Sequence, residues 1–210
     1  MRLLYAMALL VLGQFALGGS NAHAFNAEDV KKLLETKKCK GCDLSGANLE
    51  GADLEGAYFP YSNLKYTNLI NANLKKSKIW NADFESSVLK GAILCNAILY
   101  NTNFFLADLS GADLKGAGLD ESRLEQAVLI KANLQGAHLK QVNMQGADLE
   151  GASLRSTKLE KSDLRNVNFK DTDMINTYLH EAVLDENGIN YAKQHKAQFT
   201  KDERVDSIEK

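Results

Sequence analysis

Two of the three cysteines stand at the spacing of a thiol–disulfide exchange motif. Cys39 and Cys42 enclose Lys40 and Gly41, but the sequence lacks the thioredoxin-like βαβ context that such a redox site requires. A structural disulfide in an oxidising compartment is therefore the favoured interpretation, and thiol–disulfide exchange is the alternative. Metal binding is disfavoured because no third or fourth ligand follows nearby. Cys95 has no evident partner and is expected to be a free thiol.

Regularly spaced Asp and Asn residues are the other groups that could do chemistry, as ligands or as acids and bases. Their spacing serves the fold better, because outward Asp and Asn side chains can hydrogen-bond the backbone at turns. Ser-His-Asp patterns, Gly-rich phosphate loops and zinc-ligand spacings are absent from the sequence. We therefore predict a protein that is not an enzyme and that has no cofactor and no metal site.

These residues lie in a stretch, 42–186, in which one position in five is large and apolar. The 29 positions of this central column, from Leu44 to Leu184, hold 22 Leu, four Phe, two Met and one Ile. Two residues before each central residue stands a small residue, in most pentads Ala, Ser or Thr. A fixed short period of this kind is the signature of a stacked repeat array.

A period of five excludes the common regular elements. In an α-helix, five residues leave successive Leu about 140° apart around the axis, and in a flat strand an odd period sends them to opposite faces. A chain that turns a corner once per pentad buries the whole column inside a closed coil. Gly stands two residues after the central residue at nine places, which suits a turn because Gly adopts positive φ freely.

A second period of 20 lies on top of the period of five. The residue before the central residue is Asp or Asn in 16 of 29 pentads, and sorting the pentads by four places all 16 in three columns. The fourth column consists of Tyr58, Lys78, Ile98, Gly118, His138, Lys158 and Tyr178. This pattern predicts four pentads per coil and one face unlike the others. His138 and His180 fall on that face about 10 Å apart along the axis, too far to share a metal.

Tandem units such as Ala47-Asn48-Leu49 and Ala112-Asp113-Leu114 resemble the pentapeptide-repeat family. The resemblance implies an all-β solenoid, a right-handed quadrilateral β-helix of about seven coils of four pentapeptides. A short helix that runs into Cys-x-x-Cys-Asp-Leu is similar to exported, cyanobacterial and lumenal-like members. Short α-helical caps at the ends are therefore part of the expected fold.

The segments outside the repeat are expected to be processed, capping or disordered. Residues 1–24 have a positive start, an apolar run and Ala22-His23-Ala24 as a cleavage site, which predicts a secretory signal peptide. Residues 25–41 read as an N-terminal capping helix, at 26–37, and a linker. Residues 187–199 read as a C-terminal cap, expected to be helical, and 200–210 as a disordered tail.

Export to the periplasm, the thylakoid lumen or the extracellular space follows from the signal peptide. Once Arg2 is removed with that segment, 24 Lys and Arg remain against 27 Asp and Glu. This nearly neutral balance argues against nucleic acid, and against a membrane after cleavage, as partners.

Apolar side chains at outward positions are the informative departures from the repeat. On the fourth face they predict a protein-binding site formed by Tyr58, Pro60, Tyr61, Trp80, Ile98 and Tyr100. Positions 60, 80 and 100 are one coil apart, so their side chains are expected to stack about 5 Å from one another. Such a patch is typical of a partner site; scattered surface apolarity is the alternative.

The sequence thus favours a non-enzymatic exported scaffold that binds a protein partner, or itself, through this aromatic face. One family branch instead mimics duplex DNA and protects topoisomerases, a role that needs the cytoplasm and a sustained acidic stripe. Here the outward columns alternate in sign, as in Glu50, Ile70, Lys90, Ser110, Ile130, Glu150 and Lys170. DNA mimicry is therefore disfavoured, and a thiol–disulfide role through Cys39 and Cys42 is a further alternative.

Overall fold

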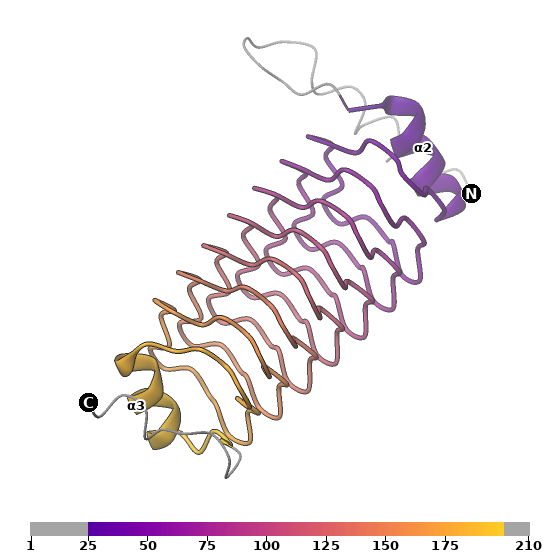
Figure 1. Ribbon diagram of the computed structural model, residues 1–210. Helices are drawn as coiled ribbons and strands as arrows, with labels where there is room; N and C mark the ends of the chain where they lie inside the picture. The colour runs from indigo at the N-terminus through magenta and orange to yellow at the C-terminus, as the bar shows by residue number, and fades with distance from the viewer. Residues whose placement is uncertain (1–24, 200–210) are drawn as a thin grey trace.

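The structure, a computed structural model, describes residues 25–199 as a rod of stacked coils with one helix at each end (Figure 1). The predicted signal peptide and the predicted tail lie outside the described residues. Within the described part, neither helix is long and apolar enough to cross a membrane.

Parallel backbone pairing between residues 20 positions apart builds the rod. The four sides of one coil are represented by the bridges Asp43↔Asn63, Asn48↔Asn68, Asp53↔Asn73 and Tyr58↔Lys78. Each bridge is a single residue wide, because the chain turns again after every pentad. The pairing confirms four pentads per coil; the count of about seven coils stays a prediction.

Most corners are four-residue turns closed by a backbone hydrogen bond. At the first corner of the repeat, the N–H of Ala47 donates to the carbonyl of Leu44 at 3.0 Å, and Gly46 has a φ of 71°. A turn with positive φ at its third residue is a type II turn, which explains the preference for Gly there. Residues with a Cβ atom adopt the same conformation at a cost of about 1–2 kcal/mol that Gly avoids, for example Tyr61 with a φ of 61°.

The interior contains the two columns that the period of five assigned to it. Leu114 and Ala112 are both 0 % exposed, and a stacked ring pair, Phe84 and Phe104, has its centroids 4.9 Å apart. Where Thr replaces Ala, its hydroxyl donates to a carbonyl of the preceding coil, as from Thr67 to Leu44 at 2.9 Å. The polar group is thereby satisfied inside an apolar core.

Helix α2, Ala27–Thr36, covers the first coil, as the sequence predicted for 26–37 (Figure 1). Asn26 caps its N-terminus, and Val30 and Leu33 are buried against the coil. The lid also supplies partners for the open edge of the ladder: the N–H of Asn26 donates to the carbonyl of Asp43 at 3.2 Å, and the N–H of Asp43 donates to Asp29 at 2.9 Å.

Helix α3, Glu186–Gln194, covers the opposite end but is shorter than the cap expected at 187–199. The expectation was wrong for the last residues, which return to the ladder. Gln198 bridges Tyr178, and the half-buried Phe199 packs against the core in register with Leu179. The first bridge likewise precedes the expected boundary at residue 42, because Lys38 already pairs with Tyr58. Helix α3 therefore interrupts the solenoid without changing its register, whereas α2 precedes the first bridge.

The inward and outward assignment can be tested at neighbouring positions in the middle of the rod. Leu114→Ala should lower the free energy of unfolding by about 2–5 kcal/mol, because it leaves a cavity in a packed interior. Lys115 is exposed, and Lys115→Ala should change the same quantity by less than about 0.5 kcal/mol. Chemical denaturation of both variants measures the difference, and equal midpoints would contradict the assignment.

Candidate functional site

Three of the four faces of the rod use their Asp and Asn side chains to hold turns. The Oδ1 atom of each such residue accepts the N–H two positions ahead, as between Asn48 and Glu50 at 3.2 Å. Many also bond between coils, as from Asn63 Nδ2 to Asp43 Oδ1 at 3.1 Å. These contacts confirm the predicted structural role of the Asp and Asn columns.

The fourth face, called face 4, lacks these side-chain ladders but has backbone pairing from end to end. Its outward column is Lys38, Tyr58, Lys78, Ile98, Gly118, His138, Lys158, Tyr178 and Gln198, all joined by consecutive bridges. The first and last bridges of the described residues both belong to this face. Face 4 is thus a continuous support whose side chains are not needed to hold the turns.

Aromatic side chains gather on the N-terminal half of face 4. Tyr58 and Trp80 form an edge-to-face pair with ring centroids 5.5 Å apart, and Trp80 is half-buried. Tyr61 and Tyr100 are the most accessible members, at 54 % and 45 % exposed. The Nζ atom of Lys40 lies 5.4 Å from the centroid of the Tyr61 ring. Rings fixed on a β-sheet face lose little entropy on binding, which suits them to an interface.

The expected stack of residues 60, 80 and 100 is not what the structure shows. Pro60 is buried, so it offers no accessible contact surface. Trp80 pairs diagonally with Tyr58, whereas the Tyr100 ring lies against Gly118, 3.7 Å from the position that a Cβ atom would take there. The missing side chain of Gly118 leaves room for the ring, so Tyr100 leans toward the next coil. Ile98 lies between them, half-buried.

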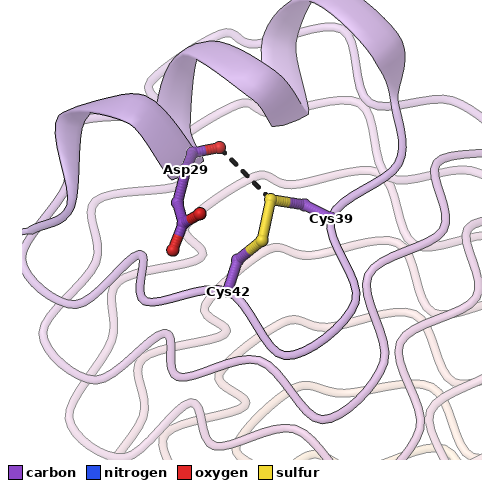
Figure 2. A group of neighbouring side chains, drawn as sticks. All are labelled: Asp29, Cys39 and Cys42. Carbon is purple, nitrogen blue, oxygen red and sulfur yellow. Dashed lines mark hydrogen bonds between the residues drawn. A yellow bond between two sulfur atoms is a disulfide. The ribbon is translucent and has the colours of Figure 1, made fainter.

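The two cysteines near the N-terminus form a disulfide beneath the lid helix (Figure 2). Their Cα atoms are 5.5 Å apart, and Cys39 and Cys42 are 0 % and 4 % exposed. Cys39 occupies an inward position one pentad before Leu44, so the bond closes the first corner of the ladder. The disulfide therefore lies at the junction of lid and coil, as the structural interpretation requires.

Asp29 of α2 is the residue that sequence reasoning missed at this junction. Its carbonyl oxygen lies 3.3 Å from Cys39 Sγ, and its carboxylate lies within 4.8 Å of both sulfur atoms (Figure 2). The three residues could supply metal ligands only after reduction, since a thiolate and not a disulfide sulfur binds metal. Burial of both sulfur atoms also closes the disulfide to an exchange partner while the lid is in place.

Cys95 has a partner that its sequence position did not reveal. Its Sγ atom donates to Asp113 Oδ2 at 2.9 Å from the neighbouring coil. Burial, together with this carboxylate, raises the pKa of the Cys95 thiol to about 11. Cys95 forms no disulfide within the described residues, which confirms the expected free thiol, and its hydrogen bond to Asp113 is a contact that the sequence did not indicate. Because the pKa is raised, the reactive thiolate is scarce near neutral pH.

Within residues 25–199, the three histidines do not converge on a common site. His138 Nε2 lies 3.4 Å from Lys158 Nζ on face 4, while His180 Nε2 lies 3.2 Å from Glu181. His195 stacks on Tyr191 beside α3, with centroids 3.8 Å apart. There a hollow of about 420 Å³ separates the last coil from the helix. Each of these three histidines has its own local contact.

These features define a capped, four-sided β-solenoid with one face that is distinct from the others. The chain belongs to the pentapeptide repeat family: the model described as pentapeptide repeats, with eight copies, matches residues 38–75, 77–105, 107–146 and 147–185. Pentapeptide repeat proteins form right-handed quadrilateral β-helices and are structural or protein-binding scaffolds rather than enzymes.

Solved structures of the same family resemble this chain. HetL, involved in heterocyst differentiation regulation in the cyanobacterium Nostoc sp. strain PCC 7120, is 26 % identical, with coverage of 77 % of this chain and 81 % of HetL and a TM-score of 0.48. A thylakoid lumen protein of Arabidopsis thaliana is 26 % identical over 76 % of this chain and 77 % of its own, with a TM-score of 0.19. QnrB1, a plasmid-mediated fluoroquinolone resistance protein, is 18 % identical over 70 % and 83 %, with a TM-score of 0.39. No curated protein matches the chain.

The free thiols of the purified protein can be counted. With Cys39 and Cys42 bonded, denaturation without reductant should expose one free thiol per chain, from Cys95. A colorimetric thiol assay gives the number, and the Cys95→Ser variant should give zero. Three free thiols in the wild type would show that packing alone holds the lid.

The raised pKa of Cys95 predicts slow alkylation of the folded protein. Below pH 11 the thiolate fraction, and with it the alkylation rate, should rise about tenfold per pH unit. Asp113→Asn removes a neighbouring negative charge, lowers the pKa, and should speed alkylation at pH 8. Asp148→Asn, on a different face, is the matched control. Mass spectrometry measures both rates, and equal rates would contradict the assigned cause.

Proposed function

We propose that this protein is a non-enzymatic exported scaffold that binds a protein partner, or a second copy of itself, through the N-terminal half of face 4. The observation that carries the proposal is the gathering of Tyr58, Tyr61, Trp80 and Tyr100 on the one face that has no Asp or Asn immediately before its central residues. Large rings at such exposure are typical of binding surfaces, since aromatic anchors dominate the energetics of interfaces.

The backbone beneath these rings supports a binding role. Tyr58 bridges Lys38 on one side and Lys78 on the other, and Lys78 bridges Ile98, so the patch rests on consecutive paired coils. A surface that is already ordered loses less entropy when a partner binds. Ile98 adds a half-buried aliphatic side chain to this half of the face, whereas Pro60 is buried and offers no contact surface.

Export is the second part of the proposal. It rests on the signal-like residues 1–24, which lie outside the described part, and it agrees with a disulfide at Cys39 and Cys42, because such bonds persist in oxidising compartments. The periplasm, the thylakoid lumen and the extracellular space all meet this condition.

Two alternatives have less support. A DNA mimic would need a sustained acidic stripe, whereas carboxylates here pair with cations along the rod, as Glu150 does with Lys170 at 2.6 Å and Asp108 with Lys90 at 3.0 Å. A thiol–disulfide role would need access to sulfur atoms that the lid covers. Association through face 4 is the proposal that agrees with the exposed chemistry of the molecule.

Removing the central ring tests the proposal. Trp80→Ala should weaken association with the partner, or self-association, while lowering the free energy of unfolding by no more than about 1 kcal/mol. Tyr178→Ala is the matched control, because Tyr178 is an exposed aromatic residue on the C-terminal half of the same face. Quantitative pull-down from the exported fraction and light scattering of the purified protein measure the two kinds of association.

Two outcomes would contradict the proposal. One is equal association of the Trp80→Ala and Tyr178→Ala variants. The other is a fluorescence spectrum of the isolated monomer that reports a fully dry indole. The chain contains a single Trp, so the emission reports this position alone.

A further inference from the structure

The aromatic half of face 4 differs from the rest of the rod in charge as well as in shape. Four successive segments form it, 38–41, 58–61, 78–81 and 98–101, and the sequence places three Lys and no Asp or Glu in them. We call this surface the aromatic–lysine patch. Its members are Lys38, Lys40, Tyr58, Tyr61, Lys78, Trp80, Ile98 and Tyr100.

The lysines of the patch are not neutralised by the protein itself. Within residues 25–199, Lys38, Lys40 and Lys78 form no ion pair, and all three are exposed. On the corner beside the patch, Lys75 and Lys76 outnumber a single carboxylate, Glu55. Within its own four segments the aromatic–lysine patch is therefore positive, and carboxylates begin on the next coil of face 4 with Asp120 and Glu121.

The C-terminal half of the same face is built in the opposite way. There Lys140 pairs with Glu160 at 3.5 Å, and Lys161 pairs with Glu181 at 3.4 Å. The two halves share one backbone ladder, so the difference lies in the side chains alone. Of the three lysines on the C-terminal half two are thus paired, while the half-buried Lys158 lies 3.4 Å from His138 and forms no ion pair within residues 25–199. On the aromatic half all three lysines are exposed and unpaired, which indicates that the charge of the patch serves a contact outside the chain.

Charge also decides between a partner and a second copy. In a two-fold symmetric dimer the same surface of both copies meets, so a self-complementary interface needs both signs of charge. Two aromatic–lysine patches placed face to face would oppose cations to cations. Like charges in contact disfavour association, which leaves a negatively charged occupant as the better match.

The spacing of the lysines suits an extended chain. Lys38 and Lys78 are two coils apart, about 10 Å along the rod axis, with Tyr58 on the coil between them. A polyproline II segment repeats every three residues, about 9 Å, and is already extended before it binds. Carboxylates three residues apart could thus meet successive lysines while the intervening residues lie on the rings.

We propose that the aromatic–lysine patch binds an extended acidic segment of a partner protein. The proposal rests on the proposed function and names the chemistry of the partner. Exposed ion pairs contribute little energy each, so the rings supply most of the affinity, while Lys38, Lys40 and Lys78 select for carboxylates and speed the encounter.

The fluorescence of the single Trp measures binding directly. The probe is a blocked 12-residue peptide of four Glu-Pro-Pro units, titrated into the full exported chain at low salt. Emission from Trp80 should change saturably, and the affinity should fall as salt is added, because exposed charges are screened. The same peptide with Gln in place of Glu should bind at least about fivefold more weakly.

Two double variants with the same change in net charge distinguish the charge of the patch from the net charge of the protein. Lys38→Gln with Lys78→Gln should weaken binding of the Glu-Pro-Pro peptide about fivefold or more. Lys140→Gln with Lys161→Gln removes the same charge from the other half and should leave binding within about twofold of the wild type. Equal loss in both double variants, or equal binding of the Gln peptide, would overturn the proposal.

Further measurements show whether the acidic segment or the proposed function is wrong. A single-stranded oligothymidylate that binds more tightly than the peptide would overturn the proposal in favour of a nucleic acid. If the acidic peptide does not bind up to millimolar concentration while Trp80→Ala still reduces partner association, the acidic segment is wrong and the proposed function stands. If neither effect is seen, both are wrong.

Discussion

Axial backbone pairing is the constraint on which the rest of this structure depends. Every side of a coil must offer its N–H and C=O groups to the residue 20 positions away, so each coil must contain four pentads. Asp43, Asn48, Asp53 and Tyr58 each meet this demand with the next coil. The apolar column, the small column and the positive-φ corner then follow, because only side chains of those sizes and turns of that type close a coil of constant width.

This constraint also gives the four faces different structural roles. Where Asp or Asn precedes the central residue, the side chain stabilises the following corner and is not available for another role. Face 4 relies on backbone pairing without that help, and it can therefore vary: Gly118 gives space to Tyr100, and Tyr58 supports Trp80. Face 4, whose outward side chains are needed least for the fold, therefore has the side chains best suited to binding a partner.

The repeat made the fold predictable, because a period of five with a period of 20 above it is compatible with few backbones. Features that depend on contacts outside the period were less predictable. Phe199 keeps the register of the central column after two pentads that α3 replaces, so its position in the period was visible in the sequence only beyond an interruption. Asp29 reaches the disulfide from a separate helix, and Asp113 reaches Cys95 from the next coil. The burial of Pro60 and the lean of Tyr100 reflect local side-chain packing, which column positions do not encode.

The helical lids have a consequence for assembly. The 20-residue period is kept from the first coil to the last: Asn48 and Asn168, for example, stand at equivalent positions of the repeat. The two ends of the rod therefore present similar backbone edges. With bare ends, one molecule would stack on the next in register, a head-to-tail contact that never closes and that grows into a fibre. Helices α2 and α3 stand across opposite ends (Figure 1). Because each helix covers an end of the rod, it blocks this head-to-tail stacking of one molecule on the next.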